Sequence, residues 1–484
     1  MEIVSFRTPG LGDQSHLLVH EGVGVLVDPQ RDVDRFLRVV AERDVELRFV
    51  LETHLHNDYV SGAEQAALRT GAELVLPAAA AAAYRYTPAF HLEDLTGGRG
   101  LLVRPIHTPG HTPEHTSYLV LADGESAALF SGGSLLVASA GRPDLLGPER
   151  ARTLARLQYG SLRRLAALPP RTGLFPTHGE GSFCTSSGAG RHTSTIGAEL
   201  TGNPLLALAT GGTASTAPGA STGAAESGVS TGAAESGVST GAADTADAAE
   251  AFADALLAEP MPIPAFYRHM GRANTLGVPP MPLPRVPELT ATAVPAEARV
   301  VDVRPRRAQA QGALPGSVGI EPGDDFGSWA GWLLPYRTPI VLVAERDQDV
   351  TEEVVQLARI GMDEVRGVVR DLGPAATQTF TLVDLPAFLR HLALPGAQVL
   401  DVRMPAERKA ARLDGAVERF LPDLVTEGVP AALDRDRPVL VACGSGRRAS
   451  IAATLLAGEG HRPVVLTGAG IPDVIAAHAA HRAA

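Results

Sequence analysis

The sequence predicts a multidomain α/β protein, and three observations support this fold class. First, 484 residues exceed the usual size of one hydrophobic core, so two to four domains of roughly 100–200 residues each are expected. Second, apolar runs of strand length alternate with segments of helical spacing along most of the chain. Third, a segment rich in Gly, Ala, Ser and Thr separates the first half from a second half that contains an internal repeat.

Composition and charge exclude several functional classes. The chain has 45% hydrophobic and 20% charged residues, as globular proteins do, and its net charge of -12 argues against a nucleic-acid partner. The start, MEIVSFRTPG, has no charged region followed by an apolar one, and no stretch approaches the ~20 apolar residues of a membrane span. We therefore expect a cytoplasmic protein without a membrane partner. Cys184 and Cys443 lie far apart, which indicates separate thiols rather than a disulfide framework.

The first half is expected to open with a meander of strands and to continue with alternating helices and strands. Apolar runs predict strands at Ile3–Phe6, His16–His20, Val23–Val27, Leu47–Leu51 and Leu101–Ile106. Helices are predicted at Val33–Glu42, after a capping box of Ser61 and Glu64, and at the alanine run Ala78–Ala83.

Three segments that bear histidine follow predicted strands. His54, His56 and Asp58 come directly after Leu47–Leu51, so one short turn presents two imidazoles and a carboxylate. His111 lies in the rigid turn HTPGHTPEH, and His178 lies in PTHGEGSFC. Such nitrogen and oxygen donors suit zinc or iron, and three histidines with one open position form an accepted metal site. Solvated surface loops are the alternative for the first two of these segments, each taken alone.

In their order, THLHNDY, HTPGHT, FSGGSLLVASAGRPDLLG and PTHGEGSFC resemble the metallo-β-lactamase fold, most closely its persulfide-dioxygenase and glyoxalase II branches. The resemblance implies an αββα sandwich over residues 1–209, with the metal at the edge between the two sheets. It implies one divalent metal, iron or zinc with iron favoured, held by His54, His56 and His111. It also implies that Asp58 and His178 are second-site or outer-shell residues.

Two positions depart from the family pattern. Tyr59 stands where the family has histidine, so a second metal would lose a nitrogen ligand and a dinuclear hydrolase is disfavoured. Gly133 stands where the family has an aspartate that completes the metal site. Weak iron binding and low dioxygenase turnover are therefore expected, and Gly133→Asp is expected to raise both. Asp58 and His178 are the first candidates to replace the missing ligand.

Cys184 follows His178 closely and is expected near the same pocket. It is either a small buried hydrophobe or, if exposed, an acceptor of sulfur near the metal.

Two segments are expected to connect the halves. Residues 210–250 contain STGAAESGV at Ser221–Val229 and again at Ser230–Val238. Such a segment buries too little apolar surface to offset the entropy of ordering it, so a flexible linker is expected, whose deletion should leave stability nearly unaltered. Residues 251–290, which include the proline-rich Met261–Pro284, are expected to form an extended connector.

The second half contains two similar units, expected at residues 291–372 and 380–484. Val300-Val-Asp302-Val-Arg304 in the first matches Val399-Leu-Asp401-Val-Arg403 in the second, and each unit continues into an apolar strand, Ile340–Ala344 or Val439–Ala442. This pattern indicates two small doubly wound α/β domains. Glu345 stands where the second unit has Cys443, so the first unit is expected to be an inactive structural or docking module.

The loop Cys443-Gly444-Ser445-Gly446-Arg447-Arg448 lies between a strand and a helix expected from about Ala449 to Ala457. Backbone N–H groups, the helix dipole and two guanidinium groups would stabilise a thiolate there, which predicts a nucleophile rather than an inert buried cysteine. The form C-x-x-G-x-R, with Asp401-Val-Arg403 upstream, resembles the rhodanese sulfurtransferases. Cysteine phosphatases place their arginine one residue later, so a donor of sulfane sulfur fits better than a phosphate.

The order of domains resembles bacterial fusions of a persulfide-dioxygenase-type metallo-β-lactamase domain with an inactive and an active rhodanese domain. The resemblance implies a sulfurtransferase in which Cys443 carries sulfane sulfur between thiosulfate or a small, glutathione-like persulfide and a thiol. The metal domain would oxidise persulfide to sulfite. A glyoxalase II-type thioester hydrolase and a non-catalytic persulfide sensor or scaffold stay open as alternatives, as does a homo-oligomer.

Overall fold

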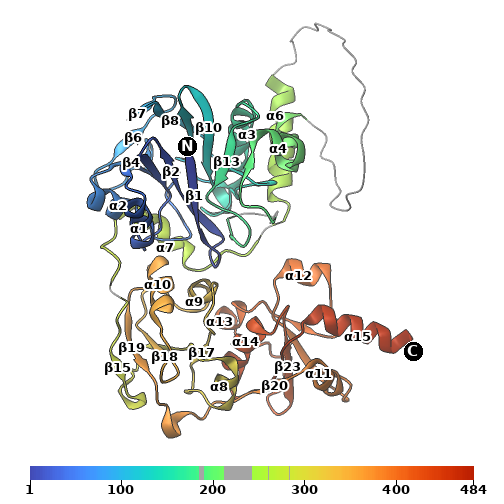
Figure 1. Ribbon diagram of the computed structural model, residues 1–484. Coiled ribbons are helices and arrows are strands. Elements are labelled where there is room, and N and C mark those ends of the chain that lie inside the picture. The colour runs from blue at the N-terminus through green and yellow to red at the C-terminus, as the bar shows by residue number, and fades with distance from the viewer. Residues whose placement is uncertain (185–189, 212–241, 260, 283, 484) are drawn as a thin grey trace. The chain divides into compact units, whose positions relative to one another are not determined.

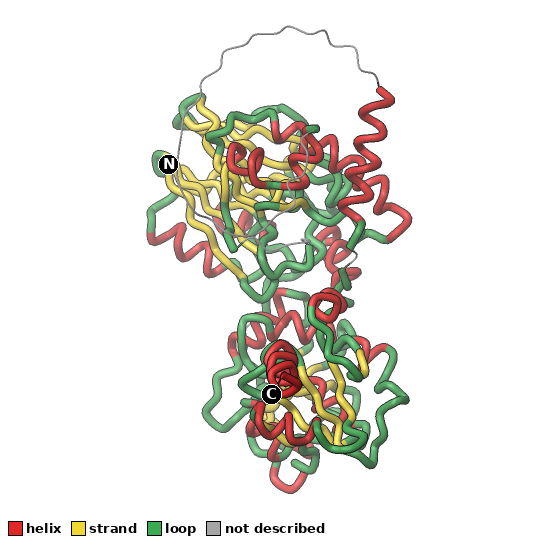
Figure 2. Tube along the Cα trace, turned by 90° about the vertical axis from the view of Figure 1, so that its right-hand side faces the viewer, coloured by secondary structure: helices red, strands yellow, loops and turns green. Residues whose placement is uncertain are grey.

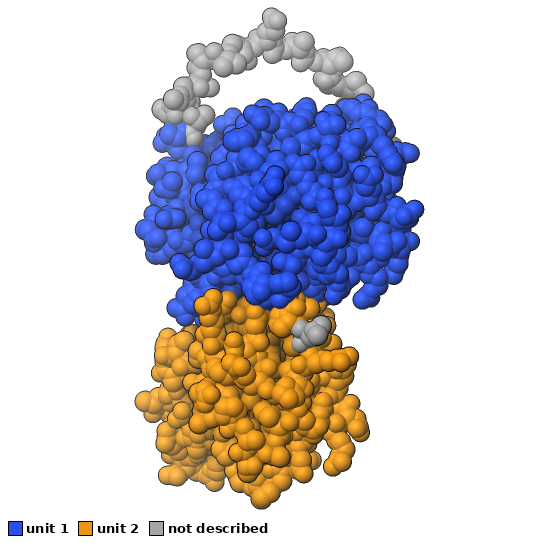
Figure 3. All heavy atoms as spheres, turned by 90° about the vertical axis from the view of Figure 1, so that its left-hand side faces the viewer, with its two compact units in different colours: residues 1–280 blue, residues 281–484 orange. Residues whose placement is uncertain are grey.

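The structure, a computed structural model, describes residues 1–484 apart from 185–189, 212–241, 260, 283 and 484 (Figure 1). Contacts divide the chain into two compact units, Met1–Pro280 and Met281–Ala484, which are coloured separately in Figure 3. The repeated sequence Ser221–Val238, and with it most of the predicted linker, lies outside the described residues.

Within its described residues, unit 1 contains two six-stranded sheets (Figure 1). In spatial order the first consists of β1 (Glu2–Thr8), β2 (Asp13–His20), β3 (Val23–Val27), β4 (Glu46–Leu51), β5 (Glu73–Pro77) and β6 (Thr87–Ala89). The second consists of β14 (Ser194–Thr195), β13 (Gly173–Pro176), β10 (Glu125–Gly132), β9 (Thr116–Ala122), β8 (Leu101–His107) and β7 (Leu95–Gly98). A short hairpin pairs β11 (Leu135–Leu136) with β12 (Ser139–Ala140).

These sheets form the middle layers of the expected αββα sandwich. Successive side chains of a strand face opposite ways, so Leu18 of β2 packs between the sheets, whereas Leu17 packs outside against the helix that contains Phe36. That outer layer consists of α1 (Asp34–Glu42) and α2 (Ala63–Thr70). The opposite outer layer consists of α3 (Pro148–Ala166), α4 (Ile196–Gly202), α5 (Pro204–Thr210) and α6 (Ala242–Leu257). In Figure 2 the yellow strands of this unit lie between red helices.

Two local predictions in unit 1 are wrong. The cap of α2 is Gly62 and not a capping box, because the Ser61 hydroxyl donates to Glu52. The alanine run Ala78–Ala83 is not helical: Ala81 has φ 53° and the Ala83 N–H donates to the Thr275 carbonyl over 2.7 Å. A tertiary contact therefore overrides the helix propensity of alanine here.

The expectation of an extended connector also needs correction. α6 packs on α3 through Phe252, which is fully buried, and α7 (Tyr267–Leu276) lies inside the proline-rich segment. Both helices belong to unit 1, which extends to Pro280. The apolar residues of this segment are isolated among prolines and show no helical period, so the sequence did not predict α7. The contacts that stabilise this helix come from distant parts of the chain.

Unit 2 contains two five-stranded parallel sheets within its described residues. The first has the spatial order β15 (Glu288–Leu289), β19 (Val365–Val369), β18 (Ile340–Val343), β16 (Arg299–Asp302) and β17 (Val318–Gly319). The second has the order β20 (Thr381–Val383), β24 (Arg462–Leu466), β23 (Pro438–Ala442), β21 (Gln398–Asp401) and β22 (Val417–Glu418). The two orders are the same relative to the chain, which confirms the internal repeat.

Helices flank these two sheets as expected for doubly wound domains. The first repeat has α8 (Arg306–Gln311), α9 (Phe326–Leu333), α10 (Thr351–Arg359) and the 3-10 turns Ala291–Ala293 and Gly373–Ala375. The second has α11 (Leu385–Leu392), α12 (Pro405–Ala410), α13 (Asp423–Thr426), α14 (Arg447–Gly458) and α15 (Ile471–Ala483). No helix among the described residues combines the length and the apolar character that crossing a membrane requires.

The repeated Asp-Val-Arg motif makes the same contacts in both repeats. Arg304 Nη2 donates to Asp302 over 2.6 Å and Arg403 Nη2 donates to Asp401 over 2.8 Å. Each guanidinium also donates to a backbone carbonyl, of Gly312 or Ala411. The motif therefore stabilises the fold of each repeat, whether or not that repeat carries a cysteine.

Candidate metal centre and cysteine loop

The loops that follow β4, β8 and β13 bring the predicted metal ligands together in unit 1. His54, His56, Asp58, His111 and His178 are each at most 1% exposed. The solvated-loop alternative is therefore wrong. Side-chain donors fall into groups close enough to share one ion: His54 with His111 and His178, His56 with Asp58 and His178, and His56 with Asp28 and Glu52. The structure thus groups His54 and His111 with His178 rather than with His56.

The Nδ1 atom of His54 must carry a proton. The Thr53 hydroxyl donates its hydrogen to Asp28 Oδ2 over 2.7 Å, so at 2.9 Å from His54 Nδ1 it acts as an acceptor. A neutral His54 ring consequently has its lone pair on Nε2. Asp28 remains ionised for this role: burial raises its pKa, but the neighbouring His56 and hydrogen bonds from Thr177 and Thr53 outweigh burial and lower it to about 2.

The other two rings have the same proton arrangement. His111 Nδ1 lies 2.8 Å from the Arg142 carbonyl, which is an acceptor. His178 Nδ1 lies 2.8 Å from Asp13 Oδ1, which accepts from the ring when Asp13 is ionised, although burial raises the pKa of this carboxyl group. The Nε2 atom of His111 is therefore unprotonated, and it has no hydrogen-bond partner among the described residues. The Nε2 atom of His178 is unprotonated when Asp13 is ionised. Partners that fix the tautomer of a histidine in this way are typical of metal sites.

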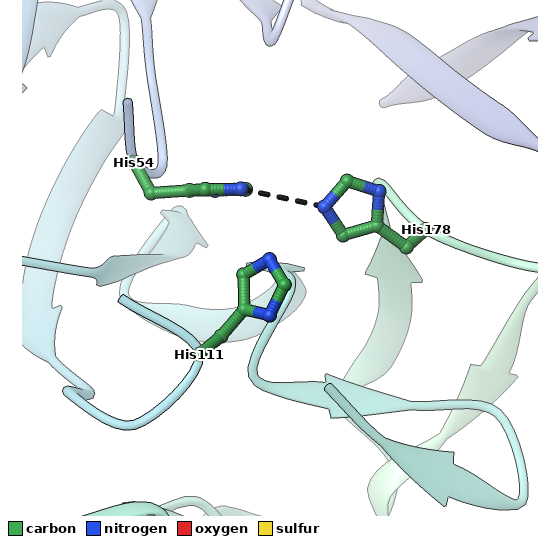
Figure 4. Close-up of side chains that lie close together, drawn as sticks. All are labelled: His54, His111 and His178. Atoms are coloured by element: carbon green, nitrogen blue, oxygen red, sulfur yellow. Dashed lines mark hydrogen bonds between the residues drawn. The ribbon is translucent and has the colours of Figure 1, made fainter. Parts of the chain in front are cut away.

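The three rings point toward one another (Figure 4), and the contact between two of them fits a cation. His54 Nε2 and His178 Nε2 lie 3.3 Å apart, although both carry lone pairs. Burial, together with the neighbouring histidines for His54 and His111, lowers the pKa of each ring, so a bridging proton is disfavoured. Converging lone pairs on neutral rings repel one another unless a metal ion lies between them, so these residues fit a metal.

His56 is held differently from its neighbours. The Tyr59 hydroxyl donates to the Asp28 carbonyl over 3.1 Å and lies 2.9 Å from His56 Nε2, which must therefore donate to it. The free atom of His56 is Nδ1, 4.0 Å from Asp58 Oδ1, and both atoms are without partners in the described part of the chain. Tyr59 thus leaves the Nδ1 atom of His56 free to bind a metal. The tyrosine itself supplies no ligand in place of the histidine that the family has at this position.

Gly133 allows His111 to occupy its position. A Cβ atom at residue 133 would lie 2.3 Å from His111 Cδ2, which no ordinary contact permits. The Gly133 N–H donates to His115 Nε2 over 2.9 Å, so His115 holds this turn and has no free nitrogen for a metal. The expected benefit of Gly133→Asp is contradicted by this geometry, because the new side chain would displace a ligand ring.

Sequence reasoning missed the buried acids that support the histidines. Asp28 accepts hydrogen bonds from the backbone and hydroxyl of Thr53, and Asp13 orients His178. Asp28 follows β3 directly and has φ 50°. In the sequence this position indicates only a turn before Pro29. No local pattern marks an acid whose partners lie on other strands, so only the fold reveals these two.

Cys184 lies beside the metal residues but inside the protein. Its side chain is 1% exposed, and its Sγ lies 3.5 Å from Asp58 Oδ2 and 3.9 Å from the Tyr267 hydroxyl. Burial and the nearby acids raise the pKa of the thiol. The expected position is found, and the thiol is a protonated buried group rather than an exposed acceptor.

α7 covers the loop that carries the first histidines. Asn274 is 2% exposed and its Nδ2 donates to the carbonyls of His56 and Tyr59, over 2.8 Å each. Its Oδ1 accepts the Ser61 N–H over 2.9 Å. The segment missed by sequence reasoning therefore fixes the backbone of the metal loop.

The cysteine loop of unit 2 has a geometry suited to a nucleophile. Cys443 follows β23 and is 1% exposed, as Cys184 is, but the Gly446 N–H donates to its Sγ over 3.1 Å. Gly446 has φ 89°, a conformation that favours glycine, and caps α14, whose positive end faces the loop. Arg448 forms an ion pair with Glu407 of α12 and lies against Gly444, so its positive charge stays beside the sulfur.

Arg447 does not face the cysteine. Its guanidinium forms an ion pair with Asp325 at 2.7 Å and donates to the Glu321 carbonyl over 2.8 Å, both in the first repeat. Of the two arginines predicted to stabilise the thiolate, the structure leaves this role to Arg448. Arg447 instead connects the cysteine loop to the other repeat.

The corresponding loop of the first repeat contains its own side-chain bridge. Gln348 accepts the Glu345 N–H over 3.0 Å and donates to the Val303 carbonyl over 2.8 Å. A glutamine side chain thus bridges the loop that follows β18, at the position in the repeat where the second unit has the cysteine loop. That the first repeat is an inactive module stays a prediction.

Family models match two parts of the chain. Residues 9–178 match the metallo-beta-lactamase superfamily and residues 385–476 match the rhodanese-like domain. Unit 1 therefore has the metallo-β-lactamase fold with a His/Asp cluster suited to a metal, and the C-terminal part of the chain has a rhodanese-like domain. Together these domains indicate an enzyme that handles sulfur compounds.

Individual proteins are similar to parts of this chain. A probable metallo-hydrolase of Burkholderia pseudomallei is 28% identical over 42% of this chain and 80% of its own length. A hydroxyacylglutathione hydrolase of Cereibacter sphaeroides is 33% identical over 37% of this chain and 66% of its own length. The solved structure of a metallo-beta-lactamase from Staphylococcus aureus has a TM-score of 0.61 and 24% identity, covering 76% of this chain and 98% of that one, which shows the fold.

Proposed function

We propose that this chain is a persulfide-handling enzyme, in which one metal ion in unit 1 serves persulfide oxidation and Cys443 carries sulfane sulfur. The observation that carries the proposal is the convergence of three Nε2 lone pairs, from His54, His111 and His178, on one buried point. Three neutral donors leave the charge of a divalent ion uncompensated. An anionic ligand, such as the persulfide RSS⁻, is therefore favoured at an open position.

His178 supplies the third ligand in place of the carboxylate that Gly133 lacks. It also belongs to the group with His56 and Asp58, so a second ion there would retain only those two as unshared donors. The remaining group, His56 with Asp28 and Glu52, has carboxylates that already accept hydrogen bonds from Thr53 and Ser61. One ion per chain is therefore favoured. Iron is favoured over zinc because zinc has no redox chemistry, and iron when bound would supply the activation of O2.

The residues of this chain fix the state of the ligands and exclude water. Thr53, the Arg142 carbonyl and Asp13 hold the Nδ1 protons, so the Nε2 atoms stay free for the metal. The buried surroundings protect the reacting sulfur from side reactions. In the overall reaction one O2 and one water convert RSSH to the thiol RSH, sulfite and two protons.

Cys443 performs the transfer step. Its thiolate attacks the outer sulfur of thiosulfate, sulfite leaves with the bonding electron pair, and Cys443 keeps a persulfide. An acceptor thiolate then takes the outer sulfur and the Cys443 thiolate leaves. The Gly446 N–H and the amino end of α14 stabilise the negative sulfur before and after transfer.

Mass spectrometry tests the transfer step. After incubation with thiosulfate, the peptide that contains Cys443 should gain one sulfur atom, which cyanide should remove as thiocyanate. Cys443→Ser should show neither gain nor turnover, since serine forms no persulfide. Cys184→Ser is the matched control and should retain both. Sulfur on Cys184, or thiocyanate formation by Cys443→Ser, would refute the assignment.

Thioester hydrolysis is the second candidate, and the hydroxyacylglutathione hydrolase relative favours it. Such a reaction would use the same buried cluster to activate water. The free atoms His56 Nδ1 and Asp58 Oδ1 could hold a second ion together with His178, and Asp28, Glu52 and His56 form another group of donors that does not use His178. Hydrolysis of S-lactoylglutathione with two bound metals per chain would favour this candidate over persulfide oxidation.

A further inference from the structure

A cavity of about 520 Å³ lies in unit 1 against the loops that carry the metal residues. Leu55 and Asn57, which alternate with His54, His56 and Asp58, form part of its wall, as does Thr112, the neighbour of His111. α7 forms the facing wall. The cavity therefore touches two of the loops that build the metal centre.

α7 presents a positive face to this cavity. Arg268, Gly271, Arg272 and Thr275 line it, and their spacing places them on one side of a helix. The other side holds Met270 and Asn274, both buried. A Cβ at Gly271 would lie 2.8 Å from Asn57 Oδ1, so the glycine lets the helix approach the metal loop closely.

The two arginines of this face are available to a ligand. Arg268 and Arg272 are exposed and make no hydrogen bond or ion pair with the described residues. The third charged group of the cavity, Glu114, already accepts the Leu55 N–H over 3.0 Å. The cavity thus carries an excess of positive charge.

Deeper in the cavity, two buried polar groups lack partners. Asn57 is 7% exposed and Thr112 is 1% exposed, and Asn57 Nδ2 and Thr112 Oγ1 make no hydrogen bond within the described structure. Leaving such groups unsatisfied costs about 1–3 kcal/mol each. Because both can donate, they fit the same kind of ligand as the arginines, one rich in acceptor oxygens.

We propose that this cavity binds the anionic end of a small persulfide, with an oxyanion group on Arg268 and Arg272 and polar acceptors on Asn57 and Thr112. The inference rests on the proposed function, because it assigns the substrate end that the metal centre does not hold. Leu55 and Leu146 supply an apolar wall for the connecting chain. α7 lies outside both segments matched by family models, so its two arginines belong to a part of this chain that those matches leave unassigned, whereas Asn57 and Thr112 lie within the first segment.

Two kinds of thiol offer this chemistry: glutathione through carboxylates and coenzyme A through phosphates. Calorimetric titration with S-methylglutathione and with S-methyl-coenzyme A distinguishes them, because neither analogue can react. At least one should bind to the full-length protein, and its Kd should rise with salt, as expected for ionic contacts. The persulfide of the thiol whose analogue binds should be a better substrate than the persulfide of 2-mercaptoethanol, whose far end carries no charge.

The double variant Arg268→Gln and Arg272→Gln should raise the Kd of that analogue at least tenfold and abolish its salt dependence. KM for the matching persulfide should rise by a similar factor, while kcat and the metal content change less than twofold. Arg38→Gln removes an exposed helical arginine outside the cavity and should change nothing.

Unchanged analogue binding in the double variant would overturn the inference, and so would equal KM for the persulfides with a charged and an uncharged far end. Failure of the proposed function has a different signature. In that case the wild-type protein would consume no persulfide at all, whereas the calorimetric titration would still report whether the arginine pair binds an anion.

Discussion

Gly133 determines how closely the His111 ring approaches the backbone of the turn after β10. Gly133→Asp should lower the affinity for the metal at least tenfold, because the new Cβ forces the ring away from its bond to the Arg142 carbonyl. Gly133→Ala, which adds the Cβ without a carboxylate, should lower it similarly. Competition with a chelator of known affinity measures both. Tighter binding in the Asp variant but not in the Ala variant would show that the carboxylate becomes a ligand and that the steric argument is wrong.

His16 makes unit 1 sensitive to acid. Burial outweighs its contact with the Pro176 carbonyl and lowers its pKa from 6.5 to about 4. The unfolded chain takes up a proton near pH 6.5 and the folded chain does not. Proton uptake by the unfolded chain therefore lowers the free energy of unfolding of unit 1. The full stability is present above pH 6.5 and is lost progressively as the pH falls toward 4. At pH 5 the loss amounts to about 2 kcal/mol.

Hydrogen exchange of β2 and β13 measures this effect, since His16 joins these strands at 3.1 Å. His16→Gln should flatten the dependence of their protection on pH between 7 and 5. Trp329 and Trp332, which both lie in unit 2, give a fluorescence control for the other unit. Equal dependence on pH in both proteins would exclude His16 as the cause.

Single residues show how far a sequence can define a site. The histidines stand out because they occupy short motifs after apolar runs, and Tyr59 and Gly133 stand out as departures from those motifs. Which nitrogen of each histidine is free depends on Thr53, Arg142 and Asp13, whose roles arise only from the fold. Adjacent arginines are likewise equivalent in sequence, yet Arg448 stays at the cysteine loop while Arg447 reaches Asp325.

α7 is the element on which the backbone of the metal loop depends. Asn274→Ala would remove three hydrogen bonds and leave two carbonyls and one N–H buried without partners. Local opening of α7 and of residues 53–61 should become easier by about 3 kcal/mol. Hydrogen exchange followed by mass spectrometry reads this change directly. Leu276→Ala, at a 56% exposed position of the same helix, should have little effect, and equal protection in both variants would contradict this role of Asn274.

Elements with a clear period were predictable, and those fixed by distant contacts were not. The strand predicted at Val23–Val27 and the helix predicted at Val33–Glu42 agree with the structure. Both were predictable because an apolar run and helical spacing are local signals. α7 has many prolines around it and gains its stability from Asn274, Tyr267 and Met270, which contact residues far away in the chain. The alanine run Ala78–Ala83 failed for the opposite reason. Its helical propensity is high, but the Ala83 N–H donates to the Thr275 carbonyl of α7 and the run is not helical.

At the scale of the whole molecule, the sequence predicted the succession of folds from motifs and from an internal repeat. The αββα sandwich and the rhodanese-like domain are found as expected. The extent of unit 1 was underestimated, since helices that follow the undescribed segment 212–241 pack back onto it. Where a unit ends depends on which surfaces bury one another, and composition alone carries little of that information.

The most direct test of the central claim compares two substrates on the same iron-loaded, full-length protein. With glutathione persulfide, O2 consumption and sulfite release should occur in equal amounts with one iron per chain, and S-lactoylglutathione should be hydrolysed far more slowly. His111→Gln should lose iron and O2 consumption together, while the transfer of sulfur by Cys443 persists. Rapid hydrolysis of S-lactoylglutathione by a protein that leaves the persulfide and O2 untouched would contradict the claim.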